Sequence, residues 1–313
     1  MKVLFVAGAN TEGFEMPPLI LTQGESLAKS GVEVSYFPII GKGMFGYLKN
    51  IKKIKTYLKS NSIDLIHAHY SFAGLLVSLS NTKIPIVVSL LGSDVNSNRI
   101  INKLVLKSLR FFSWDAIIVK SQEMSDKISL INCIIPNGVN TELFQPLDKI
   151  DCQINLKWNL EKKHILFAAD PNRIEKNFDL TQKAVDKLGN NNIDLHCLKN
   201  VKRENVPIWL NAADLIVLSS LWEGSPNVIK ESMACNKPIV ATDVGDISWL
   251  FGEESGHFIS KPFPKEFSEN IKLGLLYSEY NKTTNGRDRI FKLELDADTV
   301  ANNIIEIYNL HKR

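Results

Sequence analysis

Residues Leu215–Thr242 read LIVLSSLWEGSPNVIKESMACNKPIVAT, and this stretch carries the clearest signal of the fold. It begins with a short apolar run, Leu215–Ser219, and ends with another, Pro238–Thr242. Between them, Asn227–Ala234 has the spacing of an amphipathic helix that starts just after a proline. Strands that are apolar on both faces and are joined through a helix are typical of a parallel sheet covered by helices. The stretch therefore predicts a strand–helix–strand unit of an α/β protein.

The same alternation continues along the rest of the chain. We expect strands at Lys2–Ala7, Val32–Ile40, Ile63–His67, Ile84–Leu90, Asp115–Lys120, His164–Ala169 and Ile193–Leu198, and helices at Pro17–Lys29, Tyr47–Ser60, Ser71–Ser80, Ile100–Phe112, Phe178–Leu188, Val206–Ala213 and Asp298–Leu310. The polar stretch Gln145–Glu161 has weak periodicity and predicts a linker. We therefore expect two Rossmann-like, doubly wound α/β domains, residues 1–148 and 149–297, with a C-terminal helix in 298–313 that packs back on the first.

The composition is that of an ordinary globular protein. The 313 residues are 44% hydrophobic and 23% charged, which suits two domains of roughly 150 residues. A net charge of +3 is low for a nucleic-acid-binding protein, so we expect no nucleic-acid partner. The cysteines are far apart, and no apolar run approaches the roughly 18 residues of a membrane span. We expect a soluble, cytoplasmic protein without disulfides, a zinc site or another metal site.

The loop between the strand and the helix, Ser220–Pro226, follows the carboxyl end of a strand, where open α/β sheets bind ligands. The first backbone N–H groups of a helix have no partner within it, so we expect those of residues 227–229 to favour a phosphate. Glu231, one turn into the helix, is placed to accept hydrogen bonds from a ribose, and Glu223 to reach a sugar beyond the phosphates. The simpler alternative is that both are solvated glutamates near a helix start.

Glu223-Gly224-Ser225-Pro226, followed after four residues by Glu231-Ser232-Met233-Ala234, resembles the donor-site signature of the family 4 glycosyltransferases. Other segments that resemble the family, in the family's order, are Asp64–His69, Leu91–Val95, Ile135–Asn140 and Trp209–Asp214. The resemblance covers almost the whole chain. It implies a retaining enzyme of the GT-B fold, in which two Rossmann-like domains face each other across a cleft.

The resemblance also implies roles for individual residues. Glu223 matches the residue that contacts the transferred sugar, and Glu231 matches the one that binds the ribose. The residues that match the diphosphate-binding stretch between them are Gly224, Ser225, Pro226, Asn227 and Val228. Lys176 and, with a less regular spacing, Arg173 match a basic pair that holds the phosphates of the donor. A cation suits this place, because the leaving nucleoside diphosphate gains negative charge as the sugar departs.

The chain departs from the family pattern in its first domain. Leu91 stands where many members have a histidine before Gly-x-Asp, whereas Asp94 is retained and is our candidate for a polar contact near the sugar or the acceptor. The glycine-rich loop after the first strand is also altered. Its small residues are Gly8, Ala9, Asn10 and Gly13, and we expect their backbone to approach the donor phosphate. We expect His67 and His69 on opposite faces of their strand, with His69 toward the cleft.

Six lysines and no acidic residue lie in Lys42–Lys59, while apolar residues follow helical spacing on the other side. A basic amphipathic helix of this kind can lie on an anionic membrane, each lysine adding roughly 1 kcal/mol. The lysines expected to make that contact are Lys49, Lys52, Lys53 and Lys55. The alternative is a solvated helix whose apolar stripe packs into the core.

We therefore expect a metal-independent retaining glycosyltransferase that moves a hexose-type sugar from a nucleotide diphosphate sugar to a glycan or lipid-linked acceptor in cell-surface polysaccharide synthesis. It needs no cofactor besides this co-substrate, and it works in the cytoplasm or on the inner face of the cell membrane. Two alternatives stay open. A sugar-nucleotide 2-epimerase shares the two-domain fold, and the leucine at position 91 also fits a non-catalytic subunit that only binds the nucleotide sugar.

Overall fold

The computed structural model describes residues 1–10, 16–41, 43–96, 114–128 and 131–312 of the chain. The chain divides into two units, which we call unit 1 (Met1–Gly138 with Ala297–Arg313) and unit 2 (Val139–Asp296). Each unit is built around its own sheet, and all of the strand pairs found in the described residues are parallel. The predicted α/β fold class is therefore confirmed.

Unit 1 has a sheet with the strand order β2-β1-β3-β4-β5-β6. Its described elements are β1 (Lys2–Gly8), α1 (Pro18–Lys29), β2 (Glu33–Ile39), α2 (Gly43–Leu48), α3 (Ile51–Ser60), β3 (Leu65–His69), α4 (Ser71–Leu79), β4 (Ile86–Ser89), α5 (Ser93–Asn96), β5 (Ala116–Val119), α7 (Gln122–Asp126), β6 (Cys133–Ile134) and α15 (Ala297–His311). The order reverses at β1, which lies between β2 and β3. Such a switch point opens a crevice at the carboxyl ends of the strands.

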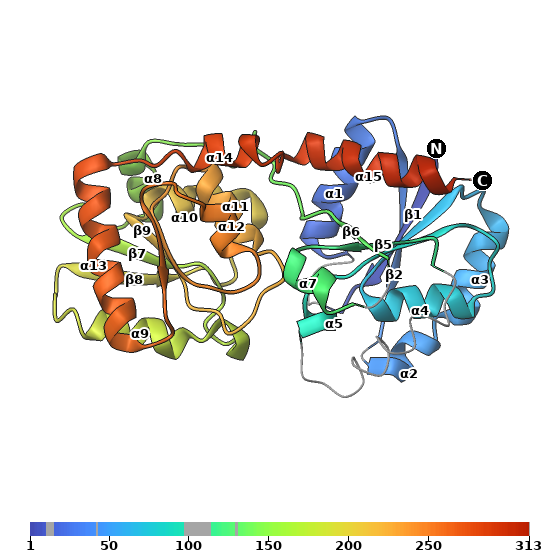
Figure 1. The fold of residues 1–313 in the computed structure, drawn as a ribbon, viewed down its shortest axis with the longest axis horizontal. Helices are drawn as coiled ribbons and strands as arrows, with labels where there is room; N and C mark the ends of the chain where they lie inside the picture. The colour runs from blue at the N-terminus through green and yellow to red at the C-terminus, as the bar shows by residue number, and fades with distance from the viewer. Residues whose placement is uncertain (11–15, 42, 97–113, 129–130, 313) are drawn as a thin grey trace. The chain divides into compact units, whose positions relative to one another are not determined.

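Helices cover both faces of the sheet of unit 1, which is why its strands are apolar on both sides. Val3 of β1 packs with side chains from α1 and α15, whereas its neighbour Leu4 packs with side chains from α3 and α4. Figure 1 shows α1 and α15 on one side of this sheet and α3 and α4 on the other. Tyr308 fixes α15 to the core: it is fully buried, and its hydroxyl lies 2.5 Å from Nδ1 of His67 on β3.

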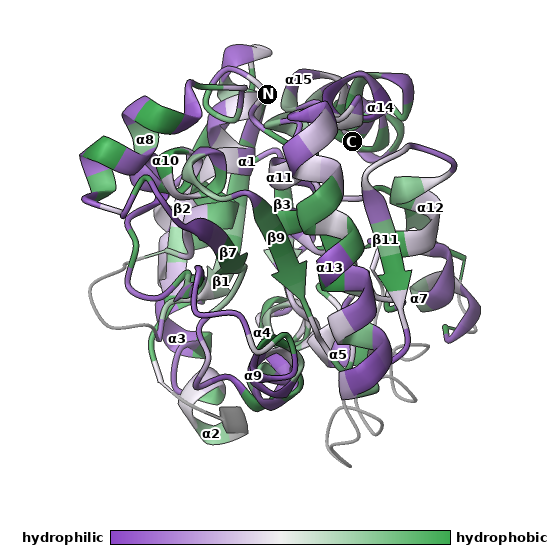
Figure 2. Cartoon of the chain, turned by 90° about the vertical axis from the view of Figure 1, so that its left-hand side faces the viewer, coloured by the Kyte–Doolittle hydropathy of each residue, from purple (hydrophilic) through white to green (hydrophobic). Residues whose placement is uncertain are grey.

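Unit 2 has a sheet with the strand order β11-β10-β9-β7-β8. Its described elements are α8 (Lys149–Leu156), β7 (Lys163–Phe167), η2 (Ile174–Lys176), α9 (Phe178–Asp186), β8 (Ile193–Cys197), η3 (Arg203–Asn205), α10 (Val206–Ala212), β9 (Leu215–Leu218), α11 (Asn227–Ala234), β10 (Ile239–Thr242), α12 (Ile247–Phe251), β11 (His257–Ser260), α13 (Pro264–Asn281) and α14 (Gly286–Lys292). Figure 2 shows β9 at the hydrophobic end of the colour scale, in line with the burial of all of its residues. The switch point of this sheet lies between β7 and β9.

The division between the units lies earlier than the boundary expected after residue 148. Val139 and Phe144 are buried in the core of unit 2, and the N–H of Val139 donates to the carbonyl of Leu295 at 2.8 Å. Residues 139–148 therefore belong to unit 2. No sequence pattern marks this division, because the contacts that cause it join residues far apart in the chain.

Several elements differ from the sequence prediction. The expected linker contains α8, which is capped where the side chain of Asp148 accepts from the N–H of Asp151 at 2.9 Å. The elements α12, β11, α13 and α14 were not predicted, although α13 is the longest helix of unit 2 that the structure describes. The helix expected at 100–112 lies outside the described residues.

Candidate functional site

The loops that follow β7 and β9 lie side by side at the carboxyl end of the sheet of unit 2. The two strands are parallel neighbours, and the strand order changes direction between them. The carbonyl of Glu175 accepts from the N–H of Leu221 at 2.8 Å, which joins the two loops directly. Oγ of Ser219 donates to the carbonyl of Asn177, also at 2.8 Å. These bonds hold the two loops at the switch point, where open α/β sheets bind ligands.

Lys176 and Glu223 form a largely buried ion pair at this switch point. Lys176 ends η2, and Glu223 lies in the loop after β9. Their side chains are 9% and 14% exposed, and Oγ of Ser220 donates to the same Oε1 of Glu223 at 2.7 Å. Breaking a shielded ion pair costs free energy unless each charge finds a new partner. A phosphate oxygen for Lys176 and a sugar hydroxyl for Glu223 are partners of the right kind.

The helix α11 begins next to this ion pair. Pro226 is its N-cap residue, with an extended backbone, and no side chain caps the helix. The N–H of Ile229 donates to the carbonyl of Pro226 at 3.2 Å, so the prediction that this N–H is free was wrong. The N–H groups of Asn227 and Val228 have no partner in the part of the chain that the structure describes, and they are the donors that the helix start offers to an anion.

Glu231 is buried and paired with an arginine that the sequence did not single out. Nη2 of Arg203 lies 2.6 Å from Oε1 of Glu231, whose side chain is 4% exposed. Arg203 belongs to η3, after β8, and its guanidinium lies over the ring of Phe144, 4.6 Å from the centroid. A ribose hydroxyl that reached Glu231 would therefore share this carboxylate with Arg203 or displace it. The sequence gives no sign of the pair, because Arg203 lies on η3 and Glu231 on α11, and these two elements are separated along the chain.

A buried polar cluster lies behind the loop Ser220–Pro226, which we call the donor loop. Lys230 is fully buried, and its Nζ donates to Oγ of Ser225 at 3.0 Å. Burial lowers the pKa of Lys230 to about 8, although Asp246 and Glu231 oppose the change. Burial likewise raises the pKa of Asp246 to about 6, against the attraction of Lys230. Sequence analysis missed this cluster, because lysine and aspartate are rarely buried and the pattern gives no sign of their environment.

Arg173 is exposed and paired locally. Its side chain is 56% exposed, and its Nη2 lies 2.6 Å from Oε1 of Glu175, two residues along the chain. The structure thus brings Lys176, Glu223 and the start of α11 together, while Arg173 is held by its neighbour. A contact between Arg173 and the donor phosphates stays a prediction.

The loop after β1 lies at the switch point of unit 1. A Cβ at Gly8 would lie 2.4 Å from the hydroxyl of Tyr47, so a larger residue here would have to displace that side chain. Asn10 is tied to Gly41: its Nδ2 donates to the carbonyl of Gly41 at 3.0 Å, and its Oδ1 accepts from the N–H of Gly41 at 2.8 Å. Gly13 lies outside the described residues. Contact of this loop with a donor phosphate stays a prediction.

Asp94 is fully buried beneath the loop after β4. Its Oδ1 accepts from the N–H groups of Leu91 at 3.0 Å and Gly92 at 3.1 Å, and its Oδ2 accepts from the N–H of Ser71 at 3.2 Å. Burial raises the pKa of Asp94 to about 6, although these hydrogen bonds oppose the change. The bonds make Asp94 the residue that holds the loop at Leu91 against the start of α4. Its polar contact with a sugar or acceptor stays a prediction.

His67 and His69 lie on the same face of β3, so the prediction of opposite faces was wrong. Residues two apart in a strand share a face, and the two rings stack with their centroids 4.2 Å apart. Both are buried, and His69 packs against Phe5 with the ring centroids 4.6 Å apart. The pair therefore belongs to the core of unit 1.

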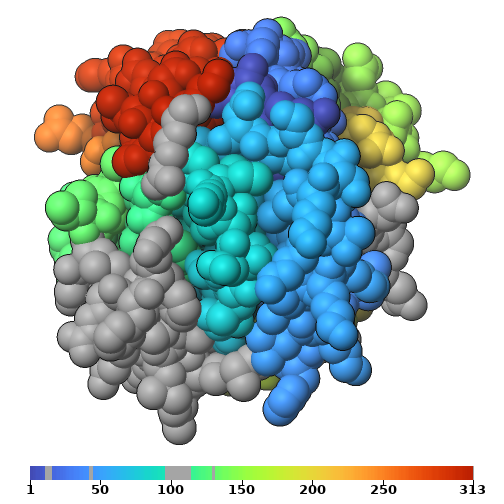
Figure 3. All heavy atoms as spheres, turned by 90° about the vertical axis from the view of Figure 1, so that its right-hand side faces the viewer, coloured from blue at the N-terminus to red at the C-terminus, as the bar shows by residue number. Residues whose placement is uncertain are grey.

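The predicted basic helix corresponds to α3 and the residues just before it. Ile54 is fully buried, and Ile51 and Leu58 pack against the same core, so the apolar stripe faces the interior. The lysines on the other side are exposed: Lys49, Lys52, Lys53, Lys55 and Lys59. Figure 3 shows this part of unit 1, in light blue, at the surface. Among the helices that the structure describes, none has the length and hydrophobicity needed to cross a lipid bilayer.

The chain is similar in sequence to a curated relative. The putative teichuronic acid biosynthesis glycosyltransferase TuaC of Bacillus subtilis is 30% identical over 227 residues. The similarity covers 64% of this chain and 58% of that relative, so the chain spans little more than half of its length.

The fold is similar to solved structures over nearly the full length of the chain. Sucrose-phosphate synthase from Thermosynechococcus elongatus matches with a TM-score of 0.79 at 16% sequence identity, covering 99% of this chain and 98% of the other. The structure of Anabaena Alr3699/HepE in complex with UDP and glucose matches with a TM-score of 0.76 at 16% identity, covering 99% and 100%. At this level of identity the likeness shows the fold.

Two family models match consecutive parts of the chain. The model of Glycosyltransferase Family 4 matches residues 12–143, and that of Glycosyl transferases group 1 matches residues 162–275. The second range contains the ion pair of Lys176 and Glu223 as well as Glu231. The expected resemblance is therefore confirmed, and with its two doubly wound units the chain belongs to the group 1, or family 4, glycosyltransferases of the GT-B fold.

Proposed function

We propose that the chain is a retaining glycosyltransferase that transfers a hexose-type sugar from a nucleotide diphosphate sugar to a glycan or lipid-linked acceptor in cell-surface polysaccharide synthesis. The observation that carries the proposal is the shielded ion pair of Lys176 and Glu223 beside the start of α11, with Glu231 one turn further. The relatives support it: the name of TuaC refers to teichuronic acid biosynthesis, and the Anabaena neighbour is a complex with UDP and glucose.

Donor binding in this proposal exchanges the partners of the charged groups. Lys176 moves from Glu223 to the diphosphate, which also accepts from the N–H groups of Asn227 and Val228. Glu223 is then free to accept hydrogen bonds from the hydroxyls of the sugar. Glu231 binds the ribose, and Arg203 gives up its contact with Glu231. Lys176, Glu223 and Glu231 each keep a partner throughout, which limits the cost of the exchange.

The transfer step uses the donor itself as the base. The bond between the anomeric carbon and the diphosphate oxygen breaks while the acceptor hydroxyl attacks from the same face. The proton of that hydroxyl moves to the leaving phosphate oxygen, so the sugar keeps its configuration. Lys176 and the first N–H groups of α11 stabilise the negative charge that grows on the diphosphate. Since these donors act where a metal ion otherwise would, we expect transfer to continue in the presence of EDTA.

The first experiment is a thermal shift assay with UDP, GDP, ADP, TDP and CMP. A nucleotide at 100 times its Kd should add about 2.7 kcal/mol to the free energy of unfolding. We expect one nucleotide to stabilise the wild type and not Glu231→Ala. Glu253→Ala, which removes an exposed glutamate of the same unit, is the matched control and should keep the full shift. If no nucleotide at millimolar concentration stabilises the wild type, the donor site is wrongly assigned.

The matching nucleotide sugar then separates the possible reactions. Transfer to an acceptor, or slow hydrolysis of the donor without one, supports the proposal. Conversion of the donor into its 2-epimer without any acceptor would identify an epimerase instead. Binding with neither transfer nor hydrolysis would identify a subunit that only binds the nucleotide sugar. If Leu91→His then gains activity, the leucine at this position is the reason that the wild type is inactive.

We also propose that Lys49, Lys52, Lys53 and Lys55 hold the chain on the inner face of the cell membrane. The contact rests on charge alone, because the apolar stripe of α3 is buried. Sedimentation with phosphatidylglycerol vesicles tests it. Replacing these four lysines by glutamine should release the protein, since each contributes roughly 1 kcal/mol. The same change at four exposed lysines of unit 2, Lys187, Lys199, Lys202 and Lys265, should have little effect. Equal losses in both variants would mean that only net charge matters.

A further inference from the structure

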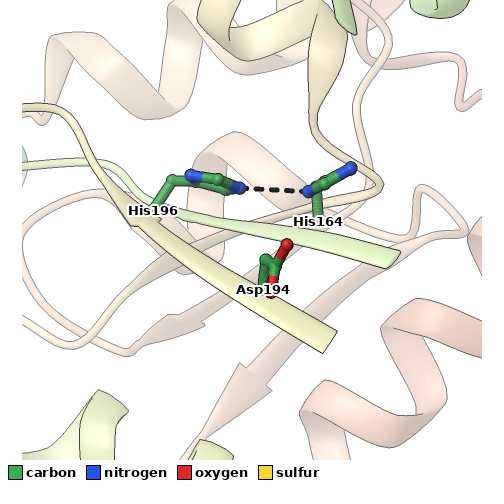
Figure 4. A group of neighbouring side chains, drawn as sticks. All are labelled: His164, Asp194 and His196. Carbon is green, nitrogen blue, oxygen red and sulfur yellow. Dashed lines mark hydrogen bonds between the residues drawn. The ribbon is translucent and has the colours of Figure 1, made fainter. Parts of the chain in front are cut away.

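Three side chains that can bind a metal ion meet on one face of the sheet of unit 2. His164 and Asp194 are paired residues of β7 and β8, and His196 lies two residues further along β8 on the same side. One ligand atom of each residue lies within 4.8 Å of those of the other two. Figure 4 shows the two imidazole rings edge to edge, with the carboxylate of Asp194 turned toward them.

The hydrogen bonds of His164 show which of its nitrogens is available. Its Nε2 lies 2.9 Å from the carbonyl of Asn159, which can only accept, so Nε2 carries the proton. In the neutral ring Nδ1 is then an acceptor, and Nε2 of His196 donates to it at 3.0 Å. If the proton of His196 moves from Nε2 to Nδ1, both Nε2 of His196 and Nδ1 of His164 have a free lone pair. A metal ion can then bind between these two nitrogens in place of the proton. The bond to Asn159 stays, and a backbone carbonyl on the second ring nitrogen is the usual support of a metal-bound histidine.

The neighbouring residues hold the other ligands in place. The ring of Trp158 is stacked on that of His196, with 3.7 Å between the centroids and 5° between the planes. Nζ of Lys162 donates to Oδ1 of Asp194 at 2.7 Å, which leaves Oδ2 as the ligand atom. His164 is fully buried, whereas Asp194 and His196 are partly exposed. The ligands are therefore ordered before an ion arrives, and the ion can reach them from solvent.

We propose that His164 Nδ1, His196 Nε2 and Asp194 Oδ2 bind one Zn²⁺ ion, with a water molecule as the fourth ligand. Two imidazoles and one carboxylate form a ligand set that zinc takes in proteins. Mg²⁺ and Ca²⁺ prefer sites made of oxygen alone, so they fit this set poorly. The proposal departs from the expectation that the chain has no metal site. It does not depend on the proposed transferase function.

The metal would join β8, at the edge of the sheet, to β7 beside it. His164 is the second residue of β7, whereas the loops of the candidate donor site follow the carboxyl ends of β7 and β9. Zinc at this place would stabilise unit 2 without touching the donor. We therefore expect zinc to raise the unfolding temperature by several degrees and to leave the affinity for nucleotide unchanged.

Isothermal titration of untagged, EDTA-treated protein with Zn²⁺ tests the site. We expect one ion per chain for the wild type and for His311→Gln, a control that removes a histidine of α15. His196→Gln and Asp194→Asn should each bind Zn²⁺ about 100-fold more weakly, or not at all. Co²⁺ provides a second readout, because the visible absorption of a tetrahedral cobalt site should appear in the wild type and the control alone.

Two results would overturn the proposal. One is a wild type that shows no saturable binding of a single Zn²⁺ ion at micromolar to millimolar concentrations. The other is Zn²⁺ binding in both ligand variants that is as tight as in the wild type, which would place the ion at other residues. The unfolding temperature of each metal-free variant checks its fold, and Asp194→Asn keeps the shape of its side chain if His196→Gln does not fold.

Discussion

At the scale of single residues, Gly245 shows how tightly the donor loop is packed. Its φ is +65°, and a Cβ there would lie 2.7 Å from the carbonyl oxygen of Gly224. Gly189 has a similar φ of +59°, but a Cβ there would meet no atom within 4 Å. A comparison of alanine variants at these two glycines therefore separates the cost of a left-handed backbone from the cost of a close contact.

We expect Gly189→Ala to lower the free energy of unfolding by about 1 kcal/mol, the cost of the left-handed conformation. Gly245→Ala should cost clearly more, and it should also weaken nucleotide binding because it displaces Gly224. Urea unfolding and a thermal shift with the preferred nucleotide measure the two effects. If both variants lower the free energy of unfolding equally and nucleotide binding is unchanged, the donor loop can move away from a Cβ at residue 245 without a further loss of stability or binding.

Lys176→Met tests the charge at the switch point. A single charged donor that stabilises the transition state is worth about 10²–10³ in kcat, so we expect a loss of this size. Lys183→Met removes an exposed lysine of α9, paired with Asp179, and should leave kcat unchanged. The measurement is the initial rate of transfer with saturating donor. A Lys176→Met variant with a raised KM and normal kcat would restrict Lys176 to binding.

Sequence analysis selected candidate residues but not their partners. Glu223 and Glu231 could be selected because they flank the start of a helix that follows a strand, and Lys176 was selected because it resembles a residue of the family pattern. The pairing of Glu231 with Arg203 could not be predicted, because it depends on how η3 and α11 meet in space. The same is true of His164, whose neighbour Asp194 is set by the register of β7 and β8.

At the scale of elements, Asp94 links the loop after β4 to the start of α4. Burial raises the pKa of Asp94 from an ordinary 3.8 to about 6, so the folded protein binds this proton more tightly than the unfolded chain. The stability that this proton contributes is complete below the ordinary pKa and is lost as the pH rises toward 6.

Asp94→Asn cannot titrate and should remove this pH dependence. The side-chain NH₂ group of the asparagine would replace one oxygen that accepts from the backbone N–H groups, so two donors would face each other. We therefore expect the variant to be less stable at every pH. The difference from the wild type should be larger near pH 4 than near pH 7, by up to about 3 kcal/mol. Urea unfolding of both proteins across this range measures it. A difference that is constant with pH would mean that Asp94 does not change its protonation there.

Tyr308→Phe tests the attachment of α15 to the sheet of unit 1. The variant loses the hydroxyl that lies 2.5 Å from Nδ1 of His67. It thereby removes the hydrogen bond between that hydroxyl and this buried nitrogen. We expect a loss of about 1–3 kcal/mol in the free energy of unfolding. Tyr280→Phe, at a side chain that is 78% exposed, should cost little. If both variants are as stable as the wild type, the bond to His67 does not secure the helix.

The elements that could be predicted are those with an uninterrupted pattern. Most strands of the two sheets are short apolar runs, and such runs can be recognised in the sequence because helices cover both faces of each sheet, but β11 was missed. Helix α8 was taken for a linker, since its start depends on one cap at Asp148 and its periodicity is weak. The stripe of α3 was recognised, but only the structure shows that it faces the core instead of a membrane.

At the scale of the whole molecule, unit 2 is a continuous segment with its own core, and it contains Lys176, Arg203, Glu223 and Glu231 of the candidate donor site. We expect residues 139–296, expressed alone, to unfold cooperatively and to bind the same nucleotide as the full chain. Circular dichroism and the thermal shift assay test both points. A fragment that folds but no longer binds the nucleotide would show that unit 1 contributes to the site.

Unit 1, in contrast, needs a segment that follows unit 2 in the chain. Val300, Ala301, Ile304 and Tyr308 of α15 complete one of its cores, together with side chains of β1 and α1. Because a ribosome makes the chain from its N-terminus, unit 2 is complete before these residues have been added. Unit 1 is made first, but the face of its sheet that α15 covers stays exposed until α15 has been made. Unit 2 is made second and lacks no segment, so it can complete its fold before unit 1 does, which reverses the usual order of co-translational folding. Chaperones that shield nascent chains should accordingly bind the β1 and α1 region until α15 has been made.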